Sequence, residues 1–254
     1  FYTDIPMRSI SLNEMETTAY KAVEGIGLAE GLCISIAKTI TILETFDLNQ
    51  LPTFNHFLDS AESIEYSPPI VLPLSDKTCE INLHDLSCVF FCSALPTRIL
   101  ELRENNGYTE FRLFNSSEFI FLLPEFLNHC RNFLEFQFSD KSSGEITLIK
   151  IDEEGGVTCS NRTKHDGDPA AIVRFTDSIG DKHQKDENWL SSKHLSFAQS
   201  HQLALQHGLE VTEQDWNSLL TNADKILVKS TDASRQGAGE STEFVDPEDK
   251  IKTT

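Results

Sequence analysis

The residues best suited to chemistry lie close to the carboxyl end of the sequence. Ser234 and Arg235 precede Gly237-Ala238-Gly239, and glycines on both sides of an alanine let successive backbone N–H groups turn toward one point. The Arg235 guanidinium adds a planar pair of donors that fits a carboxylate or a phosphate. We therefore predict an anion-binding site made of Ser234, Arg235, Gly237 and Gly239. The alternative is a flexible exit from the last helix, because small polar residues near a terminus are commonly disordered.

A second group of reactive residues combines three cysteines with a histidine, namely Cys79, His84, Cys88 and Cys92. Zinc binds such ligands, but structural zinc sites usually carry C-x2-C knuckles among polar residues. Here Cys88 and Cys92 enclose Val-Phe-Phe, which is typical of a core. We expect buried thiols with a surface His84, and no metal site.

The pair His165-Asp166 lies in the most polar histidine-containing segment. A catalytic role requires a nucleophile supplied by the fold, and the sequence has no G-x-S-x-G or S-x-x-K motif. The Asp166-Gly167 step favours a solvated turn instead.

Gly25-Ile26-Gly27 resembles the beginning of a dinucleotide-binding fingerprint, but Glu30 stands where the third glycine is needed. The segment also ends a predicted helix rather than following a strand. We therefore predict no nucleotide cofactor, and nothing else in the sequence suggests another cofactor.

The overall charge restricts the partners. The 254 residues carry a formal net charge of −19, which repels nucleic acid and anionic membrane surfaces. A local basic site still binds a small anion in this field, because directed hydrogen bonds outweigh distant, screened charges. No apolar run is long enough for a membrane helix, and the six cysteines stand in apolar surroundings. We expect a cytoplasmic protein with reduced thiols.

Two helices are predicted at the beginning of the chain. Ser11-Leu12-Asn13-Glu14 is a capping box, which starts a helix. Apolar residues then recur at intervals of three and four up to Gly25 and Gly27, and a second stripe runs from Leu28 to Leu43. The two stripes predict an antiparallel helical hairpin over residues 7–48.

The clearest strand pattern surrounds Asn106-Gly107, the preferred pair for a type I′ hairpin turn. A hairpin over residues 98–114 places Arg103 opposite Glu110 and Glu101 opposite Arg112. Opposite charges then share one face of the hairpin, which favours this interpretation.

The rest of the chain divides into a proline-containing connector at 49–76, a body at 77–211 and a carboxyl-terminal part at 212–254. In the body we predict a buried helix within 119–133 and strands at 134–138, 145–151, 157–160 and 170–176. Thr212-Glu213-Gln214-Asp215 is another capping box and starts a helix that ends near Ile226. The expected fold is α+β: a helical hairpin packed with a largely antiparallel sheet and a carboxyl-terminal helix, forming a single globular domain over residues 7–254. Residues 1–6 are expected to be a leader or a cloning remnant.

Both ends of the chain resemble a bacterial family of uncharacterised proteins, a domain of unknown function. At the start the resemblance is carried by Ser11-Leu12-Asn13-Glu14-Met15-Glu16 and Gly27-Leu28-Ala29-Glu30, and at the end by Ala233-Ser234-Arg235-x-Gly237-Ala238-Gly239. The resemblance implies no activity. It implies that both ends belong to the fold.

These signatures lead to a hypothesis about the site. The carboxyl-terminal loop returns across the helical hairpin, so that Glu14, Glu16 or Glu30 acts as a base on an anion held by Arg235. The expected function is binding, or acting on, a small anionic metabolite such as a carboxylate or phosphate. The alternative is a non-catalytic accessory protein, such as a homodimer, that works through its surface.

Overall fold

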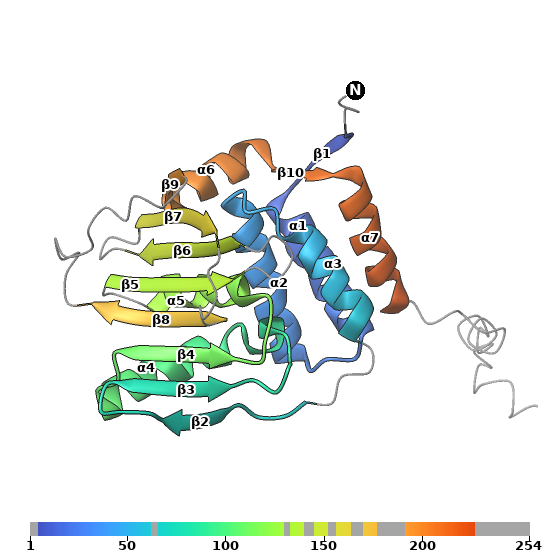
Figure 1. Ribbon diagram of the computed structural model, residues 1–254. Coiled ribbons are helices and arrows are strands. Elements are labelled where there is room, and N and C mark those ends of the chain that lie inside the picture. Colours follow the sequence, from blue (N-terminus) through green and yellow to red (C-terminus); the bar gives the residue numbers. More distant parts are fainter. Residues whose placement is uncertain are drawn as a thin grey trace, which may run out of the picture.

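The computed structural model describes residues 5–61, 66–129, 133–139, 145–151, 156–163, 170–176 and 191–226. These residues form a bundle of helices beside a large mixed sheet, and further helices lie against one face of that sheet (Figure 1). The predicted α+β fold is confirmed. The helices are α1 (Leu12–Gly25), α2 (Glu30–Thr45), α3 (Leu51–Ser60), α4 (Ala94–Asn106), α5 (Leu123–His129), α6 (Phe197–His207) and α7 (Glu213–Ala223), with the short 3-10 helices η2 (Cys88–Phe91), η3 (Phe119–Leu122) and η4 (Asp224–Ile226).

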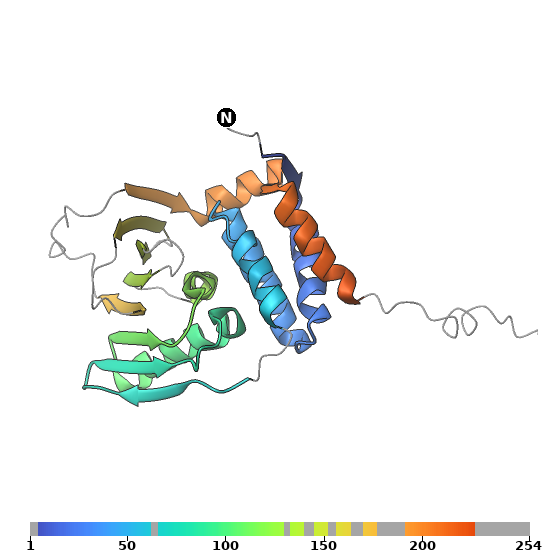
Figure 2. The same cartoon turned by 45° about the vertical axis from the view of Figure 1, so that its right-hand side comes forward.

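The predicted helix starts of the bundle are confirmed. The Ser11 hydroxyl accepts a hydrogen bond from the Glu14 amide at 3.1 Å and so begins α1. The Thr212 hydroxyl does the same for the Asp215 amide, also at 3.1 Å, at the start of α7. Helix α7 packs against α1 and α3, and Figure 2 shows these helices and α2 side by side. Hydrogen bonds to the Ser11 and Thr212 side chains therefore determine where α1 and α7 begin.

Within the described residues, ten strands form two sheets. Strands β1 (Met7–Ile10) and β10 (Leu209–Thr212) pair with each other, and the other eight follow the order β2-β3-β4-β8-β5-β6-β7-β9. Those eight strands are β2 (Ile70–Pro73), β3 (Thr78–Asn82), β4 (Glu110–Phe114), β5 (Phe133–Ser139), β6 (Glu145–Ile151), β7 (Gly156–Thr163), β8 (Ala171–Thr176) and β9 (Ser191–Ser196). Strands β3 and β4 run parallel, and the other neighbouring pairs of the large sheet run antiparallel.

The hairpin predicted at Asn106-Gly107 is wrong, because residues 94–106 form the helix α4. Gly107 has φ 73°, and its N–H bonds to the carbonyl of Arg103, which is a left-handed helix end. An Asn-Gly pair supplies the same positive φ to a hairpin turn, so the pair alone does not distinguish the two structures. The buried residues Leu95, Ile99 and Leu102 follow helical spacing. Arg103 and Glu101 therefore do not face β4 as strand partners.

The segment expected to be a connector, 49–76, contains helix α3 and the edge strand β2. Leu74 donates its N–H to Thr78 of β3, so alternate residues of β2 turn their N–H groups toward the outer edge of the sheet. Pro73 occupies one of these outward positions and has no N–H to donate, and Pro69 directly precedes the strand. This edge is therefore poorly suited to pairing with another strand.

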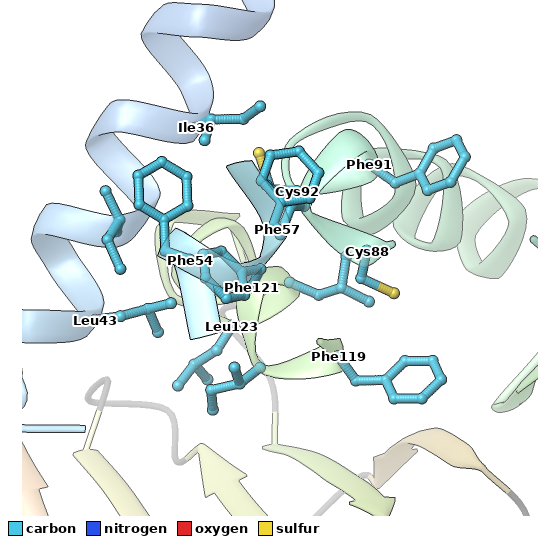
Figure 3. Packing of buried hydrophobic residues seen from close by; sticks show 14 of the residues in the cluster. Ile36, Leu43, Phe54, Phe57, Cys88, Phe91, Cys92, Phe119, Phe121 and Leu123 are labelled. Atoms are coloured by element: carbon cyan, nitrogen blue, oxygen red, sulfur yellow. The ribbon is translucent and has the colours of Figure 1, made fainter. Parts of the chain in front are cut away.

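The core joins the helical bundle to the sheet and is rich in phenylalanine. Phe54 of α3 and Phe121 of η3 have ring centroids 6.2 Å apart, and Phe57 meets Phe90 edge-on at 5.0 Å. Figure 3 shows the rings of Phe54, Phe57 and Phe121 in the same cluster as Ile36 and Leu43 of α2. Phenyl rings bury much apolar area without needing a hydrogen-bond partner. In the part of the chain described here, no helix has both the length and the apolar character needed to cross a bilayer.

Candidate functional site

The predicted anion site cannot be placed in the structure. Ser234, Arg235, Gly237 and Gly239 lie in 227–254, outside the described residues, as does the His165-Asp166 pair in 164–169. The predicted arrangement of this loop across the helical hairpin therefore stays a prediction.

The three glutamates predicted as bases are all described, and the helical hairpin separates two of them. Glu14 lies at the start of α1, where its carboxylate is 3.5 Å from the guanidinium of Arg8. Glu30 begins α2 and is exposed. Glu30 follows the last residue of α1, Gly25, by five residues, so it lies beyond the end of α1 that is opposite to Glu14. Glu14 and Glu24 are about 15 Å apart along that helix.

The third glutamate, Glu16, is half-buried on α1. It lies within the same first turns as Glu14, so it is also distant from Glu30. The structure therefore does not gather the predicted bases into one site.

The cysteine cluster is built as expected, with buried thiols and an exposed His84. The Cys88 sulfur is 3.1 Å from the Ser116 hydroxyl, which also donates to the Leu86 carbonyl at 2.5 Å. Burial raises the pKa of Cys88 and raises that of Cys92 to about 11. Buried neutral thiols of this kind are poor nucleophiles. Among the described residues no group of three or more His, Cys, Asp or Glu is arranged to hold a metal ion.

A cluster that the sequence analysis did not identify lies on the large sheet and consists of Glu110, Arg112 and Arg174. The Nε atom of Arg174 donates to Glu110 Oε2 at 2.8 Å, and the Nε atom of Arg112 donates to Glu110 Oε1 at 2.9 Å. One carboxylate thus holds two guanidinium groups, each by a single nitrogen. We call these three residues the paired-arginine cluster.

Strand register brings this cluster together. Glu110 and Arg112 are two residues apart on β4 and share a face of the sheet, and Glu110 is the register partner of Arg174 on β8. The neighbouring residues Phe111 and Val173 point to the opposite face and are buried. That opposite face is the one against which α4 and α5 lie (Figure 1). The cluster therefore lies on the face that none of the described helices covers.

Electrostatics keep the cluster charged. Partial burial acts to raise the pKa of Glu110, but the hydrogen bonds from Arg174 and Arg112 outweigh it and hold the pKa below its ordinary value. The side chains of Arg112 and Arg174 are 43% and 38% exposed. Their terminal guanidinium nitrogens make no hydrogen bond to any other described residue. The cluster carries one excess positive charge and presents two guanidinium groups to solvent.

The row of charges continues across the sheet. Glu135 of β5 is the next register partner of Arg174, and Lys150 of β6 is the partner of Glu135. The Lys150 ammonium lies 3.1 Å from Glu135 Oε1. The charges of Glu110, Arg174, Glu135 and Lys150 therefore alternate in sign over four neighbouring strands. This row places the carboxylate of Glu135 on the other side of Arg174 from Glu110.

A usable signal for the cluster was present in the sequence. Residues 110–114 read Glu-Phe-Arg-Leu-Phe and residues 171–176 read Ala-Ile-Val-Arg-Phe-Thr, and both place arginine on the face opposite to buried apolar residues. The sequence does not predict that these two strands, separated by about 60 residues of chain, pair with each other, because the register of distant strands has no short-range signature. The hairpin prediction also assigned Glu110 and Arg112 to the wrong partners.

Comparison with known proteins confirms the family resemblance for the first part of the chain. Residues 10–90 match the model of a family described as a protein of unknown function, DUF3726. The individual motifs that suggested the resemblance are not tested by this match. No curated protein sequence matches this chain.

Solved structures share the fold at very low sequence identity. A malate dehydrogenase from Pyrococcus horikoshii OT3 superposes with a TM-score of 0.62 at 7% identity, covering 90% of this chain and 98% of that chain. A putative malate/lactate dehydrogenase from E. coli gives 0.56 at 6% identity, covering 91% and 98%. A dehydrogenase from Sinorhizobium meliloti gives 0.55 at 8% identity, covering 85% and 99%. The chain is therefore similar to these enzymes in fold.

Proposed function

We propose that this protein binds a small carboxylate metabolite, and that the paired-arginine cluster is where the carboxylate is held. The observation that carries this proposal is the geometry at Glu110. The carboxylate engages only the Nε atoms of Arg112 and Arg174, at 2.9 and 2.8 Å, which fixes both guanidinium groups and leaves their terminal nitrogens for a ligand. Arginine held in this way is a preorganised donor, because less side-chain entropy is lost when the ligand binds.

Two guanidinium groups favour a ligand with two negative groups. Each terminal pair of N–H donors matches one carboxylate in a bidentate arrangement. A dicarboxylate such as malate engages both arginines, whereas a monocarboxylate such as lactate engages one. The solved structures with the same fold include a malate dehydrogenase and a putative malate/lactate dehydrogenase, and these names support a ligand of this class.

The acidic character of the whole protein does not oppose this proposal. Charges more than about 10 Å away are largely screened at 0.1 M salt, whereas the two guanidinium groups contact the ligand directly. Glu110 reduces the positive charge of the cluster but does not cancel it. We expect affinity to fall as salt is added, because the site is partly exposed.

The experiment is a thermal-shift titration with malate, lactate and inorganic phosphate. It uses the wild type, the double variant Arg112→Ala/Arg174→Ala, and Arg98→Ala as a matched control. Arg98 is an exposed arginine on α4, paired with Glu101 at 3.0 Å, so its removal changes the net charge without touching the sheet. At 100 times its dissociation constant a ligand adds about 2.7 kcal/mol of stability.

We expect malate to stabilise the wild type and the Arg98 variant, lactate to act at higher concentration, and the double variant to show no shift. Arg235→Ala is a further arm, because Ser234, Arg235, Gly237 and Gly239 remain our second proposed anion site. A malate shift lost only in Arg235→Ala moves the site to the carboxyl-terminal segment and overturns the assignment to the sheet. No shift with any of the three anions overturns the proposed function.

A further inference from the structure

Strand register determines which residues lie beside the paired-arginine cluster. Register partners on neighbouring strands point to the same face of a sheet. Arg112 of β4 is therefore in line with one residue from each of β3, β8, β5 and β6, strands that lie side by side in Figure 1. This set, which we call the Arg112 row, consists of Glu80, Arg112, Ile172, Gln137 and Leu148.

Gln137 has the same position relative to Arg174 as Arg112 has. Arg112 and Gln137 are both register partners of Ile172, one from β4 and the other from β5. Arg174 follows Ile172 by two residues on β8, so it is the diagonal neighbour of both. Diagonal neighbours on antiparallel strands are about 7–8 Å apart, a distance that long side chains span. Two guanidinium groups and one amide therefore surround Ile172 on the open face of the sheet.

Ile172 separates the side chains of Arg112 and Gln137. It is 6% exposed but does not belong to the main hydrophobic core, whereas Val173, the next residue of the strand, points to the opposite face and does belong to it. Because Ile172 is apolar, it offers no hydrogen bond to the guanidinium on one side or to the amide on the other. Both groups therefore keep their hydrogen-bonding capacity for a ligand.

The surrounding charges indicate in which direction a bound anion extends. On the β3 side, the Arg112 row continues with Glu80, whose negative charge repels an anion. On the other side, the residues of this row on β8, β5 and β6 are uncharged. In the adjacent row, the carboxylate of Glu135 is paired with Lys150 at 3.1 Å. An anion held by the two guanidinium groups is therefore expected to extend from Arg112 toward Gln137.

The Gln137 amide differs in chemistry from the two guanidinium groups. A guanidinium group only donates hydrogen bonds, whereas an amide donates through its nitrogen and accepts through its oxygen. A hydroxyl group also donates and accepts, so an amide suits a hydroxyl that lies beside a carboxylate. Gln137 is half-buried on β5, so the sheet restrains the side chain while part of it stays accessible. The amide therefore fits a ligand that carries a hydroxyl group in addition to its carboxylates.

We propose, as an extension that rests on the proposed function, that the ligand is a 2-hydroxy dicarboxylate and that Gln137 selects its hydroxyl group. The two carboxylates bind Arg112 and Arg174, and the hydroxyl exchanges a hydrogen bond with the Gln137 amide. Succinate has the same two carboxylates as malate but lacks the hydroxyl. One neutral hydrogen bond corresponds to a roughly two- to twelvefold difference in affinity, so malate should bind more tightly than succinate by this factor.

The test measures the dissociation constants of succinate and of each malate enantiomer by calorimetric titration of the full-length protein. In Gln137→Met the side chain keeps its length but loses the amide, so the tighter malate enantiomer should weaken to the level of succinate while succinate itself is unchanged. Gln137→Glu places a third carboxylate beside the anion and should weaken both ligands. Gln202→Met is the matched control, because Gln202 is exposed on α6 and lies outside the sheet, and it should behave as the wild type.

The outcomes separate this inference from the function on which it rests. A wild type that binds neither malate nor succinate overturns the proposed function, and the role of Gln137 with it. Equal affinities of the wild type for malate and succinate leave the anion site in place and overturn only the selection of a hydroxyl group. So does an equal weakening of both ligands in Gln137→Met, or an unchanged affinity for both in Gln137→Glu. The wild-type comparison decides the main point even if a variant does not fold.

Discussion

Arg174 and Glu110 are direct register partners on β8 and β4 and are also joined by a hydrogen bond of 2.8 Å between Arg174 Nε and Glu110 Oε2. The backbone ladder and the side-chain pair thus specify the same alignment of two strands that are distant in sequence. A slip of one residue would place Arg174 on the buried face, at a cost of burying its charge. The pair therefore links the register of the sheet centre to the geometry of the proposed anion site.

Because Arg112 and Arg174 share the Glu110 carboxylate, we expect their substitutions to have non-additive effects on the free energy of unfolding. Arg112→Ala or Arg174→Ala alone should cost less than about 1 kcal/mol, because the pairs are partly exposed and Glu110 keeps one arginine. The double variant should lose more unfolding free energy than the sum of the two single losses. The Glu110 side chain is only 20% exposed, and in the double variant its carboxylate loses both arginine partners. Urea denaturation of all four proteins at pH 7 measures this coupling. Strict additivity would show that the two guanidinium groups do not share the carboxylate in solution.

The end of α4 predicts opposite effects for two neighbouring residues. Gly107→Ala should lose about 1 kcal/mol, because φ 73° is unfavourable for alanine although its Cβ meets no other atom within 4 Å. Asn106→Ala should gain up to about 0.5 kcal/mol, because alanine has the higher helix propensity and Asn106 is the last helical residue. In a type I′ turn both changes would be destabilising, since both positions need positive φ. Chemical denaturation of the two variants therefore distinguishes the helix from the hairpin that the sequence pattern favoured.

These residues show which parts of the fold are readable from sequence. The sequence correctly predicts Ser11 and Thr212 as helix caps, because a cap depends on residues within one turn. The four strands predicted between 134 and 176 were found for a similar reason, since alternation is a local pattern. The hairpin predicted at Asn106-Gly107 is wrong because a type I′ turn and a left-handed helix end both require a residue with positive φ at this place. The apolar spacing of Leu95, Ile99 and Leu102 contained the deciding evidence.

The candidate site was less predictable than the fold. Arg112 and Arg174 become neighbours only through the pairing of β4 with β8, and strand order in a mixed sheet has no local signature. Glu44 resembles any helical glutamate in the sequence, and only the tertiary structure buries it and brings its carboxylate to the Gln50 and Leu51 N–H groups. Sequence motifs therefore point to other residues than these, because the structure builds its charged and buried polar groups from ordinary strand and helix positions.

The buried thiols predict a defined order of chemical modification. Cys33, Cys79, Cys88 and Cys92 are buried, whereas Cys159 is half-buried on β7. At pH 8 a thiol with a pKa of about 11 is ionised in roughly one molecule in a thousand, so Cys92 reacts slowly even when reached. Among the five cysteines in the described part of the chain, we expect iodoacetamide to label Cys159 before the four buried ones, which should react only in denaturant. Peptide mass spectrometry measures each site, and labelling of Cys88 or Cys92 in the native protein as fast as Cys159 would contradict the packing described here.

Glu44 predicts how stability depends on pH. Burial raises its folded-state pKa to about 7 from an ordinary value of 4.5, so the folded state binds the proton more tightly than the unfolded state. The resulting stabilisation is complete below about pH 4.5 and is lost as the pH rises to about 7 and beyond. The loss is about 3 kcal/mol at most, from 1.36 kcal/mol per pKa unit. Glu44→Gln keeps the acceptor for Gln50 and Leu51 but cannot ionise, so the difference in unfolding free energy between this variant and the wild type isolates the effect of one carboxyl group. Urea denaturation at pH 5 and pH 8 should show the variant gaining on the wild type at the higher pH, and a difference that does not change with pH would show that Glu44 is ionised at both values.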